Sequence, residues 1–170
     1  MQNTKDSFYL ALRDRLAMLA PERTITLNGG TLNGVTRPAI VVTENETANA
    51  SAPLPDAFYI TWLGIQSAKG YANAQHPLLE LHCRIDYWTE GTFELSYQDR
   101  GRSLASLDST LLQICAPATT PLVDHSQSPP ITLTTNIFWS RPVLAPPVAD
   151  GHRLHRVADL NIFFYSEFVC

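Results

Sequence analysis

The sequence predicts an α+β fold, with a mostly antiparallel sheet, two amphipathic helices packed on one face, and long loops. Apolar residues recur at helical spacing in two stretches, and they alternate with polar residues in several others. The expected strands also follow one another without intervening helices, which favours antiparallel pairing. The chain has 170 residues, so we expect a single domain over residues 1–170.

A first helix is expected near the N-terminus. Asp6 or Ser7 can cap it by accepting hydrogen bonds from the free amide groups of the first turn. Pro21 ends it, because proline has no amide proton and clashes with the preceding turn. One face of this helix is apolar, through Phe8, Leu12, Leu16 and Leu19.

A second helix is expected over residues 98–115, before Pro117. Its apolar side chains again recur at helical spacing, while its opposite face carries small and charged residues. The apolar face consists of Leu104, Leu107, Leu111 and Ile114.

Strands are expected wherever β-branched residues gather or apolar and polar residues alternate. The clearest is 79–88, where ten residues alternate strictly, so one face should be buried and the other wetter. The other strands are expected at 24–27, 38–43, 58–63, 131–139 and 155–168. The inward sets of the best strand, the second helix and the last strand should form the core, namely Leu81, Cys83, Ile85, Leu107, Leu111, Leu160 and Ile162.

Three long loops are expected at 44–55, 66–76 and 140–152. The last contains Pro142, Pro146 and Pro147 and should be an extended loop or arm. Residues 121–130, also rich in proline and serine, are expected to be a connection. Loops of this length are usually functional or become ordered on a partner, so we expect the three long loops to contribute to subunit contacts.

Four aromatic residues fall on the sheet face that should point away from the helices. Such a face is normally polar, so large aromatic side chains there indicate that another subunit, or a loop of the same chain, covers it. The predicted interface residues are Trp88, Phe138, Phe163 and Tyr165.

Composition excludes several classes of function. There are 12 basic and 16 acidic residues, a formal net charge of −4, so we expect no specific nucleic-acid binding. No apolar run is long enough for a membrane helix, so we expect no membrane association. Charged residues make up 16% of the chain, below the usual ~25%, which suggests that a partner covers part of the surface.

The cysteines and the N-terminus indicate a reducing compartment. Cys83, Cys115 and Cys170 are odd in number and widely spaced, which does not suit a disulfide framework. Lys5 and Asp6 interrupt any apolar stretch that could act as an export signal.

We expect no metal centre or bound cofactor. His152 and His155 are three residues apart, and His82–Cys83 could complete a zinc site. However, the two histidines are expected in a loop and at a strand start, where that offset points side chains apart. Gly29, Gly30 and Gly34 lack the residues of a phosphate-binding loop, so turn geometry explains them.

We also expect no catalytic site. Asp124-His125-Ser126 contains the residue types of a hydrolase triad, but adjacent residues cannot form the relay. Asp86, Glu90 and Glu94 could pair as acid and base, although a solvated strand edge is the simpler interpretation.

The order of elements resembles the tail-terminator and tail-completion (head–tail joining) proteins of tailed bacteriophages. The resemblance rests on the first helix, the strand Pro-Ala-Ile-Val-Val at 38–42, the strand Leu-Glu-Leu-His-Cys-Arg-Ile-Asp-Tyr-Trp at 79–88, the helix at 102–114 and the long final strands. It implies a small α+β subunit without catalytic residues. Such subunits form a ring, typically a hexamer, on the tail tube protein and meet the head connector or neck proteins.

The leading hypothesis is therefore a non-enzymatic structural subunit of the virion tail or neck, assembled in the host bacterial cytoplasm. It would form a ring that terminates the tail tube and joins it to the head connector. The alternative is a small cytosolic enzyme or ligand-binding domain with a pocket between sheet and helices. A stable monomer with a deep polar pocket would favour the alternative.

Overall fold

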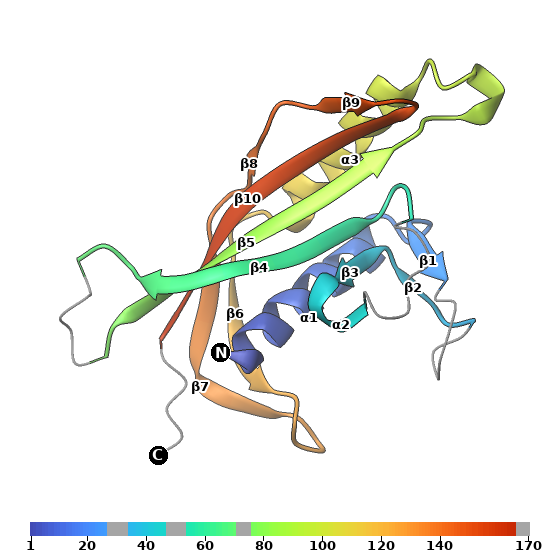
Figure 1. Ribbon diagram of the computed structural model, residues 1–170. Coiled ribbons are helices and arrows are strands. Elements are labelled where there is room, and N and C mark those ends of the chain that lie inside the picture. The colour runs from blue at the N-terminus through green and yellow to red at the C-terminus, as the bar shows by residue number, and fades with distance from the viewer. Residues whose placement is uncertain (27–33, 47–53, 71–75, 166–170) are drawn as a thin grey trace.

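The computed structural model describes residues 1–26, 34–46, 54–70 and 76–165 (Figure 1). It has an α+β fold, as the sequence predicts. The helical elements are α1 (Gln2–Leu19), α2 (Thr43–Glu46), the 3-10 turn η2 (Phe93–Leu95) and α3 (Arg100–Ile114). The strands are β1 (Thr24–Thr26), β2 (Thr36–Pro38), β3 (Ile40–Val42), β4 (Phe58–Ser67), β5 (Leu78–Thr89), β6 (Thr119–Asp124), β7 (Ile131–Trp139), β8 (Val143–Leu144), β9 (Val148–Asp150) and β10 (Arg153–Tyr165).

The main sheet is mostly antiparallel. Its strands lie in the order β3-β4-β5-β10-β7-β6, and β8 and β9 also pair with β10. Among the described strands of this sheet, only β3 and β4 pair in parallel. Strands β1 and β2 form a separate antiparallel pair.

Strands β5 and β10 form the centre of this sheet and pair along almost their whole length. Leu81 lies opposite Ile162, and Cys83 lies opposite Leu160. Side chains alternate between the two faces of a strand, so this register collects the apolar sets of both strands on one face. All seven residues predicted for the core are buried.

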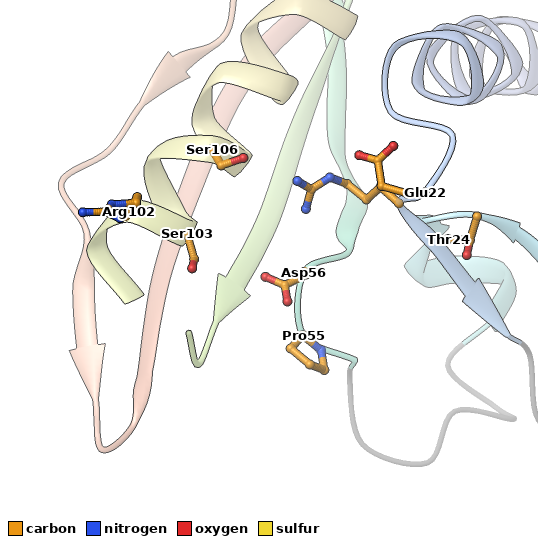
Figure 2. Close-up of a pocket in the computed structure, with 8 residues that line it drawn as sticks. Glu22, Thr24, Pro55, Asp56, Arg102, Ser103 and Ser106 are labelled. Carbon is orange, nitrogen blue, oxygen red and sulfur yellow. The ribbon is translucent and has the colours of Figure 1, made fainter. Parts of the chain in front are cut away.

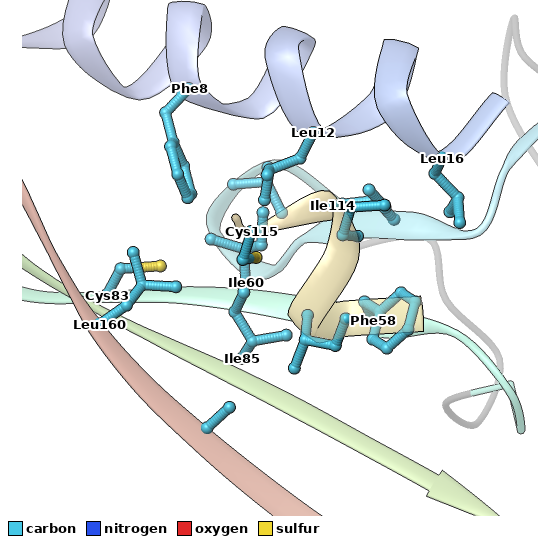
Figure 3. Close-up of a cluster of buried hydrophobic side chains, with 14 of the residues drawn as sticks. Phe8, Leu12, Leu16, Phe58, Ile60, Cys83, Ile85, Ile114, Cys115 and Leu160 are labelled. Atoms are coloured by element: carbon cyan, nitrogen blue, oxygen red, sulfur yellow. The ribbon is translucent and has the colours of Figure 1, made fainter. Parts of the chain in front are cut away.

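Both long helices pack on that apolar face. The Phe8 ring of α1 meets Trp62 of β4 at a centroid distance of 6.2 Å and Trp139 of β7 at 5.2 Å. Figure 3 shows Leu12 and Leu16 of α1 pointing toward Ile114 and the sheet. The residues of α3 predicted for its apolar face are all buried in the same cluster.

A polar contact fixes α3 on the sheet. The Tyr87 hydroxyl of β5 donates a hydrogen bond to Oδ1 of Asp108 on α3, at 2.6 Å. Nε of Arg156, on β10, lies 3.1 Å from the same oxygen. Burial, followed by the hydrogen bond to Asp108, raises the pKa of Tyr87, so the phenol stays protonated and remains a donor.

The first helix starts earlier than predicted. Neither Asp6 nor Ser7 is its cap, because the helix begins at Gln2. Asp6 accepts a hydrogen bond from the Gln2 side chain, and Ser7 faces β6, where its Oγ accepts a hydrogen bond from the Val123 amide at 3.0 Å. Leu19 is 44% exposed, so it does not continue the buried face.

The predicted strand at 38–43 is interrupted. Strand β2 ends at Pro38, and β3 begins at Ile40 and ends at Val42. Three predicted loop boundaries are also wrong. Strand β6 lies partly in the expected connection 121–130, and β4 continues to Ser67, inside the expected loop 66–76. Helix α2 occupies the start of the expected loop 44–55.

The segment 140–152 is not a free arm. It contains β8 and β9, and both form antiparallel pairs with β10. The Arg156 side chain adds a hydrogen bond to the Ala145 carbonyl at 3.0 Å. Backbone pairing with a central strand therefore holds this segment on the domain.

The core assignment predicts the effect of shortening Leu111. Leu111→Ala should reduce the free energy of unfolding by about 2–5 kcal/mol, because it removes a fully buried side chain and leaves a cavity. Urea unfolding would measure the change. Leu112→Ala is the matched control, since Leu112 is 36% exposed and its truncation should cost less than about 1 kcal/mol. A loss below about 1 kcal/mol for Leu111→Ala would show that α3 packs by another face.

Candidate functional site

The sheet face opposite the helices carries the predicted interface aromatics, and three of them lie together at one end of it. Phe138 of β7 and Phe163 of β10 lie opposite each other in the register, and their rings stack at 5.1 Å with an interplanar angle of 17°. Phe138 is 39% exposed and Tyr165 is 42% exposed. We call Phe138, Phe163 and Tyr165 the open-face cluster.

Trp88, the fourth predicted interface residue, is covered by its own chain. It is only 8% exposed, and the guanidinium of Arg153 lies 4.3 Å from its ring centroid. The carboxylate of Glu90 lies 3.3 Å from Nε of Arg153. Of the two explanations open for Trp88, cover by the same chain is therefore the one observed.

The middle of the open face is polar and paired across strands. Arg84 of β5 lies 3.0 Å from Asp159 of β10, and Asp86 lies 3.3 Å from His155. Such exposed pairs contribute little to stability. They separate the open-face cluster from the other end of the sheet.

A second exposed apolar feature lies in the connection from β5 to α3, which projects from the body of the domain (Figure 1). Phe93 is 79% exposed and Leu95 is 56% exposed. We call these two residues the apolar tip. They belong to no periodic pattern in the sequence, although two large apolar residues in a short segment after Gly91 were a visible signal.

The tip is held in place by its neighbours. Asp99 accepts hydrogen bonds from the amide and the hydroxyl of Thr92, and these bonds lower the pKa of Asp99. Gly91 has a φ of +74°, and a Cβ there would lie 2.6 Å from the Asp99 carboxylate, so no other residue fits easily.

The tip is also joined to the turn between β9 and β10. Tyr97 packs on Phe93 at a centroid distance of 5.9 Å and on His152 at 4.9 Å. Arg100 donates a hydrogen bond to the Gly151 carbonyl at 2.9 Å. The projecting segment is thus a defined structure that presents Phe93 and Leu95 to solvent.

The histidines weighed as metal ligands lie apart. His82 and Cys83 are adjacent on β5 and point to opposite faces, while His152 stacks on Tyr97 and His155 pairs with Asp86. Within the described ranges, no three His, Cys, Asp or Glu side chains are close enough to hold one metal ion.

The residues weighed for catalysis pair with other groups. Asp124 Oδ1 accepts hydrogen bonds from the amide and hydroxyl of Ser126, at 2.9 and 2.6 Å, and these contacts lower the pKa of Asp124. Asp86 pairs with His155 and Glu90 pairs with Arg153, and Glu94 lies in η2. The structure therefore does not bring these carboxylates together as an acid–base pair.

Gly29 and Gly30 lie outside the described residues. Gly34 has a φ of +80°, a conformation that favours glycine in turns.

One polar groove of about 470 Å³ lies between the start of β1, the residues before β4 and the first turns of α3 (Figure 2). Its charged residues are Glu22, Arg23, Asp56 and Arg102. Glu22, Asp56 and Arg102 are exposed, so the groove is open to solvent. Nε of Arg23 is buried without a hydrogen-bond partner among the described residues.

No protein-family model matches the chain, and a comparison with curated proteins gives no match. Within the described part of the chain, no helix has the length and apolar character needed to span a membrane.

The two described cysteines predict how stability depends on pH. Burial raises the pKa of Cys83 well above its ordinary value and raises that of Cys115 to about 12. In the unfolded chain these thiols ionise near pH 8.5, at about their ordinary pKa. Their contribution to stability is therefore complete below about pH 8.5 and is lost as the pH rises toward the folded-state pKa.

The free energy of unfolding should fall above about pH 9 by up to about 1.4 kcal/mol per pH unit for each thiol. Urea unfolding at a series of pH values would measure the slope. Cys115→Ala should reduce the slope even though it also lowers stability. A slope that is the same in Cys115→Ala and the parent would show that the Cys115 thiol ionises equally in both states.

Proposed function

We propose that the chain is a non-enzymatic structural subunit of a bacteriophage tail or neck. In this proposal it forms a ring, expected to be a hexamer, that terminates the tail tube and joins it to the head connector. The order of elements motivates this assignment through its resemblance to tail-terminator and tail-completion proteins. It also implies contacts with the tail tube protein and with head connector or neck proteins.

The observation that carries the proposal is the presence of two separate exposed apolar surfaces on one small domain. A closed ring of identical subunits uses heterologous contacts, in which two different surfaces of each subunit meet. The open-face cluster lies near Glu80, which pairs with Phe163, and the apolar tip follows Thr89. The two surfaces are therefore at opposite ends of β5, roughly 30 Å apart at the rise of a β-strand.

The rigidity of both surfaces also supports assembly. Phe138 and Phe163 are held by the sheet register, and the tip is held by Asp99, Tyr97 and Arg100. A surface that is already ordered loses little conformational entropy when it binds. Large aromatic residues, which the open-face cluster supplies, are enriched in protein interfaces.

The polar groove favours a second candidate, a small cytosolic enzyme or ligand-binding domain. Buried polar atoms are normally paired, so the Nε of Arg23 in this groove could meet an anionic ligand. Three of its four charged lining residues are exposed, which gives this candidate less support than assembly has.

The assembly proposal predicts a ring whose formation depends on both surfaces. Sedimentation and negative-stain electron microscopy of the purified chain, over a range of concentrations, should show closed rings. Phe93→Ser with Leu95→Ser, and separately Phe138→Ser, should weaken ring formation by about thirtyfold or more, the effect of losing an interface hot spot.

Circular dichroism and thermal melting should show that each variant remains folded. Met18→Ser is the matched control, since Met18 is 80% exposed on α1 and belongs to neither surface, and this variant should assemble as the parent does. A parent chain that stays monomeric at every concentration, or variants that assemble normally, would contradict the proposal.

A further inference from the structure

The outer half of β4 is a sheet edge without a neighbour among the described residues. Strand β3 pairs only with the first three residues of β4, Phe58 to Ile60. Thr43 then covers the next position, where its hydroxyl donates to the Ile60 carbonyl and contacts Thr61. A bulge between Trp62 and Gly64 follows, and all five residues from 63 to 67 are exposed.

Alternate backbone groups of this edge point away from the sheet. The Ala68 amide donates to the Leu78 carbonyl of β5 at 2.9 Å. Successive residues of a strand point their amides in opposite directions, so the Gln66 amide also faces β5. The amides of Ile65 and Ser67 therefore face outward, where no described strand receives them. In Figure 1 this end of β4 projects past α1.

The other edges of the sheet are protected. Strand β3 is buried along its whole length. Strand β6 contains Pro121, which cannot donate, and the Val123 amide is taken by Ser7 of α1. Strands β8 and β9 are two and three residues long, and Pro142, Pro146 and Pro147 flank them. Short strands, prolines and covering helices are the usual ways in which proteins prevent edge pairing.

The β4 edge lacks another common protection, which is charge. No residue of Phe58–Ser67 is ionisable at neutral pH, whereas natural edges are commonly guarded by lysine or other charged side chains. Leu63 is 51% exposed and Ile65 is 39% exposed. The strand itself therefore brings no like charges to a second copy, and each copy brings apolar side chains to the contact. The carboxylate of Glu80 on β5, next to this edge, accepts a hydrogen bond from the Gln66 side chain at 3.3 Å.

We infer that the outer edge of β4, residues 63–67, pairs with the same edge of a second copy of this chain. The two strands run antiparallel about a twofold axis, which is the commonest symmetry of soluble oligomers. The outward backbone groups around Ile65 and Ser67 then form hydrogen bonds across the axis, and the two sheets become continuous. This contact goes beyond the proposed ring, because it joins chains in pairs whether or not they also form rings.

The test removes an outward amide without touching the ladder to β5. Ser67→Pro deletes the amide of Ser67, and proline is tolerated on an edge strand when its missing N–H would face solvent. Gln66→Pro is the matched control, because it deletes an amide that faces β5 and should destabilise the fold. Ile65→Lys, which adds a charge to the edge and keeps every amide, is a second test variant.

Sedimentation equilibrium would measure association, and amide hydrogen exchange would measure protection at Ile65 and Ser67. The parent should dimerise, and both amides should become more protected as its concentration rises. Ser67→Pro should keep the folded circular dichroism spectrum and weaken dimerisation by about tenfold or more, since the deletion occurs in both copies. Ile65→Lys should weaken it as well.

Three results would overturn the inference. The parent could show no association through this edge, with both amides exchanging freely at all concentrations. Both amides could be protected in a monomer, which would mean that the chain covers its own edge. Finally, Ser67→Pro and Ile65→Lys could dimerise as tightly as the parent. Rings that persist in Ser67→Pro would leave the proposed function standing, so the two proposals can fail separately.

Discussion

The antiparallel pairing of β5 with β10 is the contact on which the rest of the structure depends. Its register sets Leu81 against Ile162 and Cys83 against Leu160, and it thereby decides which face of the sheet is apolar. A slip of one residue would move every side chain to the opposite face. Both helices would then lose the surface on which they pack, and Tyr87 could no longer reach Asp108 on α3.

The same register determines what remains exposed. The alternation that buries one set of residues places Arg84, Asp86 and Phe163 on the other face. Arg84 pairs with Asp159 and Asp86 pairs with His155, while the ring of Phe163 stacks on that of Phe138. The open-face cluster is thus a consequence of how the core is built. Its aromatic character is not required by the burial of the opposite face, because side chains on the two faces alternate.

The sequence was sufficient to predict the fold class and the core, for a physical reason. Strict alternation over 79–88 allows only one buried set, and the spacing of Leu104, Leu107 and Leu111 allows only one buried helix face. It was not sufficient for β6, where Pro121 breaks the pattern, or for the segment 140–152, whose prolines suggested a loop. Pairing of these segments depends on a distant strand, which local pattern cannot reveal.

The candidate surfaces were predicted in part. Parity identified Phe138, Phe163 and Tyr165, but it also selected Trp88, which Arg153 covers from another part of the chain. The apolar tip escaped prediction because Phe93 and Leu95 belong to no periodic element.

The most direct measurement of the proposed assembly is a cryo-electron microscopy reconstruction of the assembled chain. We expect a closed ring in which neighbouring subunits cover the apolar tip and the open-face cluster, whereas a ring that leaves both exposed to solvent would contradict the proposal.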